Sequence, residues 1–415
     1  MTPSDDPTPV PSDAPAQPPL PGEPGYPSGA AEEPPIETAA PAPGKMKQRV
    51  IPDPPEMDQA RGGRAFLFVL ALVVVTVVAM GAVLALNVVA DPYGSVGTHF
   101  FPTVTTSDRT VKADRIEALK QPPQLVVLGS SRSMRYEPSY LQKKTRLRTF
   151  NAGVNGIGGT ADAWAMTQFI HETFPKVHPN YLWLVDVESF VPFAIQGRTA
   201  GEPRLAKFVG AAGWGQGPGE LAKAIWQNRS TLFSLATAKD SLRLVLYKDK
   251  AKSSQTKFQR KVLADGALVQ RYWTKKEWDG RWPRSVARYS KIYRDAYHRL
   301  DPTAQAYLEK TLAFMNQQGA TPVLVLTPIN PKLREILGPL GWDTRHQQVV
   351  AYLESLQGKY RFKFLDLTDP SVFGFVPKQF YDGVHMTTIN TKKAIDYILK
   401  QTGGIPPVTP PAGGN

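Results

Sequence analysis

Short apolar runs recur along the chain, and between them apolar residues follow a helical spacing. Strands of a parallel sheet covered on both faces read as continuous apolar runs joined by helices. Helical stretches run from about Thr160 to Phe174 and from about Thr391 to Leu399. The expected strands are Leu125–Leu128, Arg148–Phe150, Tyr181–Val187, Pro322–Leu326 and Phe362–Leu367. The pattern therefore predicts an α/β fold with a parallel sheet and helices on both faces.

The regular spacing of strands and helices is interrupted once, between Phe190 and about Ser290. Roughly a hundred residues intervene there, and they contain helical patches such as Leu221–Trp226 and Ser285–Leu300. A parallel sheet does not need a connection of this length, since whole crossovers need only about a dozen residues or more. We therefore expect an inserted helical cap or side subdomain at about 190–290.

One apolar segment is far longer than the others. Residues Ala65–Ala90 contain no charged side chain, and these 26 residues exceed the roughly 20 that a helix needs to cross a bilayer. A cleaved signal peptide is the alternative, but its apolar region is shorter and does not follow a long polar tail. The segment predicts one transmembrane helix that anchors a single-pass protein in a bacterial cytoplasmic (inner) membrane.

The regions at the two ends of the chain have a different composition from the rest. Residues 1–64 hold 17 of the 39 prolines and 10 acidic against 5 basic side chains. Such a stretch buries too little apolar surface to offset its ordering entropy. We expect a disordered Pro-rich cytoplasmic tail at 1–64 and a second disordered tail at 403–415, which is rich in Gly and Pro. Residues 91–402 then form the extracytoplasmic domain.

The predicted outer part of the chain is strongly basic. From residue 65 onward there are 44 Lys and Arg against 26 Asp and Glu, a net charge of about +18. A basic balance suggests nucleic acid first, but an extracytoplasmic location argues against it. An anionic envelope polymer or lipid headgroups fit better. The chain has no cysteine, so disulfides and thiol chemistry are excluded. Its histidines show no metal-ligand spacing, and we expect neither a metal nor a cofactor.

Candidate chemistry lies at two places far apart in the sequence. Ser131 follows the first strand in QLVVLGSSRSMR, at the edge of the sheet where open α/β folds bind ligands. Asp382 and His385 lie three residues apart in YDGVHMTT, before the last helical stretch. A serine hydroxyl needs a base within hydrogen-bond reach, and the base needs an acid that holds it in one tautomer. The three residues can supply a nucleophile, a base and an acid.

Three short blocks of the sequence, GSSRS (Gly129–Ser133), NAGVNG (Asn151–Gly156) and DGVH (Asp382–His385), resemble those of the SGNH/GDSL hydrolase superfamily. The resemblance covers about Gln124 to Leu399 apart from the insertion, and it implies a flavodoxin-like three-layer α/β/α fold. It implies Ser131 as nucleophile, Asp382 as acid and His385 as base. It also implies an oxyanion hole formed by the backbone amides of Ser131 and Gly156.

One block departs from the family pattern. The family's third block, GxND, is expected near Leu184–Glu188, where this chain reads LVDVE. Asn155, as an oxyanion donor, and Asn330, in substrate binding, are candidates for the missing amide. The departure is similar to that of a membrane-anchored, extracytoplasmic branch that serves teichoic-acid D-alanylation and alginate or peptidoglycan O-acetylation. Members of that branch work alongside a multi-spanning O-acyltransferase, so the resemblance implies such a partner.

Two readings of function follow from these observations. The first is a serine esterase or O-acyltransferase acting on acyl groups of a cell-envelope or exported polysaccharide. The second is a catalytically inactive SGNH-fold assembly protein that binds an acyltransferase or an anionic glycan, and the missing GxND is its main argument. Two further residues, Arg132 and Arg135, either bind an anionic substrate or pair with carboxylates of the protein.

We expect residues 1–64 to face the cytoplasm and residues 91–415 to lie on the other side of the membrane. Five basic residues precede the apolar segment, and none follows it until Arg109. A reporter enzyme that works only outside the cytoplasm should therefore be active when it is fused after Asn415. Activity of a cytoplasm-only reporter at the same position would contradict this topology.

Overall fold

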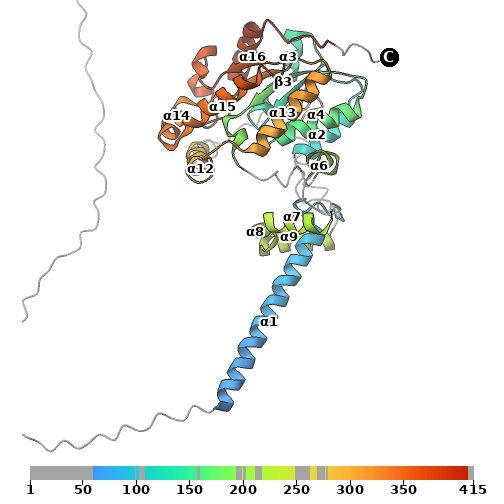
Figure 1. Ribbon diagram of the computed structural model, residues 1–415, viewed down its shortest axis with the longest axis vertical. Coiled ribbons are helices and arrows are strands. Elements are labelled where there is room, and N and C mark those ends of the chain that lie inside the picture. The colour runs from blue at the N-terminus through green and yellow to red at the C-terminus, as the bar shows by residue number, and fades with distance from the viewer. Residues whose placement is uncertain are drawn as a thin grey trace, which may run out of the picture. The chain divides into compact units, whose positions relative to one another are not determined.

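The protein contains a five-stranded parallel sheet between layers of helices (Figure 1). The computed structural model describes residues 59–98, 100–101, 108–156, 159–192, 199, 202–210, 217–247, 262–268, 276 and 279–409. Most of the predicted disordered tail at 1–64, and 410–415 of the second tail, lie outside these residues. The predicted α/β class with a parallel sheet is confirmed.

The strands lie in the order β2-β1-β3-β4-β5, which is the order of flavodoxin-like sheets. Each was predicted to within one residue at either end, except that β3 ends two residues earlier than predicted, at Val185. Asp186 instead caps a short 3-10 turn, Val187–Phe190. The strands are β1 (Leu125–Gly129), β2 (Thr149–Asn151), β3 (Asn180–Val185), β4 (Val323–Leu326) and β5 (Lys363–Asp366).

Helices fill most of the remaining described chain. Those nearest the sheet are α2 (Asp108–Glu117), α3 (Pro138–Thr145), α4 (Thr160–Thr173), α13 (Pro302–Gln317), α14 (Pro331–Leu337), α15 (Trp342–Leu356) and α16 (Thr388–Thr402). Helices before and within the insertion are α1 (Gln59–Ala90), α6 (Pro203–Val209), α7 (Pro218–Gln227), α8 (Arg229–Leu232), α9 (Leu235–Leu246) and α12 (Arg281–Asp295).

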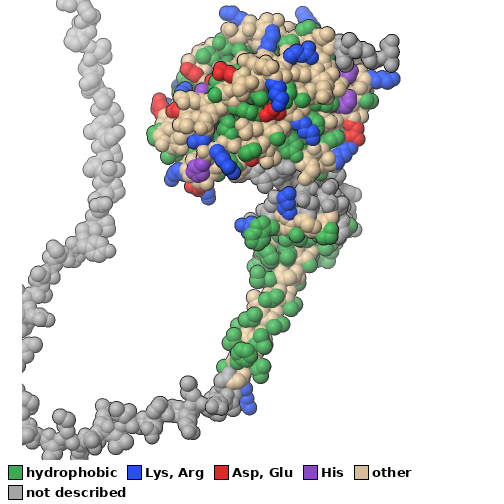
Figure 2. Space-filling view, viewed as in Figure 1, with side chains coloured by type: hydrophobic (Ala, Val, Ile, Leu, Met, Phe, Trp, Pro, Cys, Tyr) green, Lys and Arg blue, Asp and Glu red, His purple; other side chains and the backbone are tan. Residues whose placement is uncertain are grey.

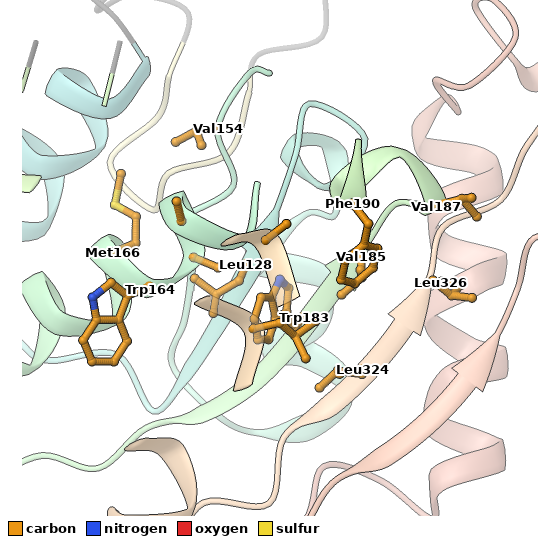
Figure 3. Close-up of a cluster of buried hydrophobic side chains, with 14 of the residues drawn as sticks. Leu128, Val154, Trp164, Met166, Trp183, Val185, Val187, Phe190, Leu324 and Leu326 are labelled. Carbon is orange, nitrogen blue, oxygen red and sulfur yellow. The ribbon is translucent and has the colours of Figure 1, made fainter. Parts of the chain in front are cut away.

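Alternate residues of the central strands pack into two separate cores. In β3, Trp183 and Val185 join the core that includes Trp164 of α4 (Figure 3), whereas Leu182 and Leu184 join the core that includes Ile395 of α16. Both faces of the sheet are therefore buried and excluded from water. This explains why these strands read as continuous apolar runs instead of alternating ones.

Helix α1 contains the predicted membrane segment. Among the described residues, Gly63–Ala90 is the one helical segment long and apolar enough to cross a bilayer. Its large side chains from Phe66 to Met80 are exposed, as Figure 2 shows along the helix. An apolar helix surface of this length is unfavourable in water, so the helix is consistent with a single-pass anchor.

The insertion is partly built into the main domain. Leu205 and Val209 of α6 belong to the same core as Trp164. The segment 262–268 lies beside β2, because the Asn151 N–H donates to the Asp265 carbonyl (2.9 Å). Residues 193–198, 211–216, 248–261 and 269–275 lie outside the described part of the chain. The helical character expected for the insertion is seen in α6 to α9.

Residues 403–409, which we assigned to a disordered tail, lie against the domain instead. Ile405 and Val408 pack on the two cores, and the Thr409 N–H donates to the Gly319 carbonyl (3.0 Å). Composition alone suggested disorder because Gly and Pro are frequent there. A few apolar side chains that pack on the existing cores of the domain are sufficient to hold such a short segment.

Lys112 of α2 lies fully buried and joins three elements. Its Nζ donates to the Asn151 carbonyl at the end of β2 (2.5 Å) and to the Gly266 carbonyl in the insertion. Burial lowers the pKa of Lys112 to about 7, although the charges of Asp108 and Asp265 act in the opposite direction. The folded protein therefore binds this proton less tightly than the unfolded chain does.

We expect the protein to become more stable as the pH rises from about 7 to about 10.5. In this window the unfolded chain retains the Lys112 proton and the folded protein releases it, so the free energy of unfolding increases with pH. Thermal unfolding of the full-length protein in detergent at a series of pH values measures the effect. Lys112→Met should flatten the rise, whereas Lys393→Met at an exposed position should not. Parallel pH profiles for wild type and Lys112→Met would contradict the assignment.

Candidate active site

Ser131 lies in a tight turn at the carboxyl end of β1. Gly129, the last strand residue, has φ +139°, and a Cβ there would clash with the Leu184 carbonyl and with Ser133. Only glycine fits, because other residues rarely adopt this conformation and β3 leaves no room. The close approach of β1 to β3 sets the direction in which the chain leaves the strand towards Ser131.

His385 and Asp382 lie in the loop between β5 and α16. One oxygen of Asp382, Oδ1, accepts the backbone N–H groups of Val384 (3.0 Å) and His385 (2.9 Å). The Tyr381 N–H in turn donates to the His385 carbonyl (2.8 Å). Such local bonds from an aspartate to the backbone define a turn. The aspartate therefore shapes the loop that carries the histidine.

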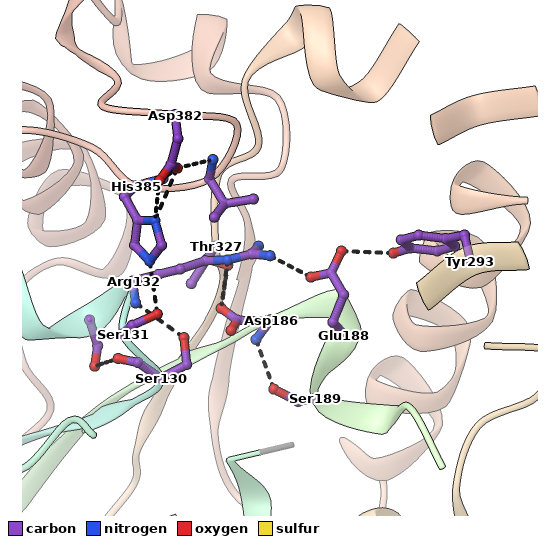
Figure 4. A network of polar contacts seen from close by, with 12 residues as sticks. Ser130, Ser131, Arg132, Asp186, Glu188, Ser189, Tyr293, Thr327, Asp382 and His385 are labelled. Atoms are coloured by element: carbon purple, nitrogen blue, oxygen red, sulfur yellow. Dashed lines mark hydrogen bonds and ion pairs between the residues drawn. The ribbon is translucent and has the colours of Figure 1, made fainter. Parts of the chain in front are cut away.

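The structure brings the three predicted residues together (Figure 4). His385 Nε2 lies 2.8 Å from Ser131 Oγ, and His385 Nδ1 lies 2.9 Å from Asp382 Oδ2. With the carboxylate on Nδ1, the ring carries its proton on that nitrogen and leaves Nε2 free to accept the serine proton. The arrangement has the distances of a Ser-His-Asp triad.

Asp382 also has a cationic neighbour, which the sequence did not reveal. Arg281, at the start of α12, donates to Asp382 Oδ2 (2.7 Å). Burial alone would raise the pKa of Asp382, but His385, the Val384 amide and Arg281 outweigh it and hold this pKa well below its ordinary value. The carboxylate therefore stays ionised and can stabilise an imidazolium.

The predicted oxyanion loop is held by α2. Asp108 Oδ2 accepts the Asn155 N–H (2.7 Å), and Arg109 donates to the Asn155 carbonyl (3.0 Å). The backbone amide of Asn155 is therefore occupied, and its side chain is exposed. Gly156 follows with φ +153°. Within the described part of the chain, the amides of Ser131 and Gly156 donate to no protein acceptor, which leaves them available to a ligand.

Arg132 is taken up by a buried polar network (Figure 4). Its guanidinium donates to Glu188 Oε2 (2.6 Å) and to Thr327 Oγ1 (3.0 Å). Thr327 donates to Asp186 (2.6 Å), and Tyr293 of α12 donates to Glu188 (2.8 Å). The side chains of Arg132 and Glu188 are 5% and 1% exposed. Of the two readings that we left open for Arg132, the structure supports pairing with carboxylates.

Arg135 has different surroundings from Arg132. Its guanidinium lies over the ring of Tyr381 (4.3 Å to the centroid), and that of Arg281 lies 5.8 Å from the same centroid. Arg135 is 8% exposed, and its Nη1 has no hydrogen-bond partner among the described residues. Burial lowers the pKa of Arg135, and the charge of Arg281 acts in the same direction. A ligand anion would relieve both effects.

Asn330 caps helix α14. Its side-chain oxygen accepts the Lys332 N–H at the start of α14, and its own N–H donates to the Gly383 carbonyl (2.9 Å). Asn330 therefore fixes the loop between Asp382 and His385. Its predicted role in substrate binding stays a prediction.

The arrangement as a whole has the groups that acyl transfer through a serine needs. It combines a serine hydroxyl beside a histidine and an aspartate with free backbone amides on neighbouring loops. Among the described residues, no three His, Asp or Glu side chains lie close enough to hold a metal ion. The chain matches no protein-family model and shows no significant similarity to a curated protein.

We expect Arg132→Met to reduce the stability of the protein instead of its affinity for substrate. The change leaves Glu188 and Asp186 buried without their cation, which typically costs about 3–5 kcal/mol. Thermal unfolding of the full-length protein should show a large decrease, and Glu188→Gln added to Arg132→Met should recover part of it. A variant that unfolds like wild type but has a higher KM would point to substrate binding by Arg132 instead.

Proposed function

We propose that this protein is a membrane-anchored serine esterase or O-acyltransferase of the SGNH type. In this proposal it acts outside the cytoplasm on acyl groups of a cell-envelope or exported polysaccharide. The observation that carries the proposal is the hydrogen-bonded triad of Ser131, His385 and Asp382. Two loops that are far apart in the sequence supply its members. The packing and stability of the fold do not by themselves require these three side chains to be hydrogen-bonded in this order.

The reaction begins with proton transfer from Ser131 Oγ to His385 Nε2 as the oxygen attacks the acyl carbonyl. The carbonyl oxygen becomes an oxyanion, for which the amides of Ser131 and Gly156 are the donors. Each such donor is typically worth about 3–4 kcal/mol. The bond to the leaving alcohol then breaks, and His385 returns the proton to that alcohol. The acyl group remains as an ester on Ser131.

A second half-reaction releases the acyl group. Water or a sugar hydroxyl gives its proton to His385 and attacks the ester carbonyl, and Ser131 Oγ leaves and regains the proton. Water gives hydrolysis and a sugar hydroxyl gives transfer. Asp382 holds the ring in one tautomer throughout and stabilises its charged form.

The place of the site in the sheet supports the proposal. The chain passes from β1 to β2 on one side and crosses to β3 on the other, so the switch point lies between β1 and β3. Ligands of open α/β sheets bind outside the carboxyl ends of the strands at this point. Ser131 follows β1, and Asp186 follows β3.

Charge favours an anionic acceptor for this activity. Arg135 and Arg281 both lie over the ring of Tyr381, which precedes Asp382 of the triad. Arg281 also forms an ion pair with Asp382 (2.7 Å). An acidic glycan of the envelope would complement this cationic pair and the basic chain. A multi-spanning O-acyltransferase in the same membrane is the partner that would supply acyl groups.

We expect Ser131→Ala and His385→Ala each to abolish labelling by a serine-directed phosphonate probe. Only an activated hydroxyl reacts with this probe, and the effects of substituting residues of a catalytic triad are not additive. The double variant should therefore lose little more than either single one. Asp382→Asn should leave slow labelling, because the ring is present but misoriented. The full-length protein in detergent is suitable, with the bound probe located by mass spectrometry.

Ser130→Ala is the matched control, since it removes a neighbouring hydroxyl from the same turn. This variant should be labelled like wild type. Labelling that persists in a folded His385→Ala variant, or that maps to Ser130 or Ser133, would contradict the assignment. A folded wild-type protein that never reacts would favour the inactive assembly protein.

A further inference from the structure

Three helices of the insertion pack against the carboxyl end of α1. We name α7, α8 and α9, residues 217–247, the collar. The side chain of Asn87 donates to the Leu232 carbonyl (2.7 Å) and accepts from Ser241 (2.8 Å). Leu84 and Val88 of α1 pack on Ala224 and Leu232, with Leu221 and Ile225 alongside. The collar and the end of α1 therefore form one packed unit.

The collar begins where the membrane-spanning part of α1 should end. A helix needs about 20 residues to cross the hydrocarbon core of a bilayer. Counted from Ala65, the first residue after the last charge, about 20 residues end at Leu84. The helix is exposed up to Ala82, half-buried at Val83 and Leu84, and buried at Asn87 and Ala90, while Ala85 and Val89 stay exposed. The protein therefore covers one face of α1 from the level where the bilayer core stops.

The collar itself exposes an unusual amount of apolar surface. Leu235 is 77% exposed and Trp226 68% exposed. Other large apolar side chains that are more than a third exposed on the collar and in its last turn are Phe233, Leu242, Val245, Leu246 and Tyr247. Figure 2 shows hydrophobic side chains continuing from α1 over these helices. A contiguous apolar patch of this kind marks an interaction surface.

The other side chains of the collar suit a lipid interface. Arg229 lies over the ring of Trp226 (4.5 Å from the centroid), and Lys239 and Arg243 are exposed on α9. Amphipathic helices with basic side chains, together with Trp, Phe and Leu, lie in the plane of a membrane interface. Trp and Tyr prefer the headgroup level. A water-facing position would leave this apolar surface uncompensated.

We propose that the collar inserts into the interfacial region of the bilayer that α1 spans, on the carboxyl side of that helix. Continuity with the apolar surface of α1 identifies lipid as the occupant of the patch. The collar thereby fixes the depth at which α1 leaves the membrane and adds a second, in-plane attachment. Anionic phosphate groups of the lipids are counterions for its exposed basic side chains, of which Arg243 also lies 3.9 Å from Asp240.

The absence of cysteine makes a site-specific test possible. Single cysteines at Leu235 and Leu246 report on the collar, and Val75→Cys at mid-helix reports on the bilayer core. Val372→Cys and Ile389→Cys are matched controls, because these apolar residues of the α/β domain are 44% and 49% exposed. Each full-length variant carries an environment-sensitive fluorophore and is reconstituted in nanodiscs of mixed neutral and anionic phospholipid.

Nitroxide-labelled lipid and aqueous iodide then serve as quenchers. We expect headgroup-level nitroxide to quench the two collar probes several-fold more than the two controls, and iodide to quench them several-fold less. The Val75 probe should respond most to a deep nitroxide. Unchanged circular dichroism shows that each variant is folded.

Two outcomes would overturn the proposal. If iodide reaches the collar probes as well as it reaches the controls, the collar faces water. If neither quencher reaches them, the patch is covered by protein, such as a second copy of this chain. Both outcomes are independent of Ser131 chemistry, so they leave the proposed activity to its own test.

Discussion

All five strands run in the same direction, so their carboxyl ends meet at one edge of the sheet. This constraint places the turn after β1, the 3-10 turn after β3 and the residues after β4 side by side. Ser131, Asp186 and Thr327 come from these three segments. The loop after β5 returns to the same edge, where the Asn330 N–H holds it through the Gly383 carbonyl. In this way Ser131 and His385 meet although they are 254 residues apart in the sequence.

The same edge also holds a cluster of buried charges. Arg132 neutralises part of the charge of Asp186 and Glu188, and Tyr293 and Thr327 satisfy further oxygens. A buried ion pair gives little net stability against an apolar replacement, but it tolerates no loss of one partner. The network thus fixes α12 of the insertion against β3. Arg281, on the same helix, is thereby presented to Asp382.

The insertion consequently has two separable physical roles. Its final helix, α12, completes the electrostatics of the candidate site through Arg281. Its earlier helices, α7 to α9, pack against the end of α1 through Asn87 and a small apolar cluster. One excursion of the chain between β3 and β4 therefore contacts both the candidate site and the end of the apolar helix.

The sequence was sufficient for the features that depend on local pattern. Apolar runs and helical spacing identified the strands and the membrane segment, because burial on both faces of a sheet or in lipid leaves a continuous apolar signature. Turn residues and a resemblance placed Ser131, Asp382 and His385. The partners of Arg132, the pairing of Arg281 with Asp382, the capping role of Asn330 and the packing of residues 403–409 were decided by the tertiary structure. Each of them depends on which side chains from distant segments lie within a few ångströms, and residue type and spacing along a single chain do not encode that proximity.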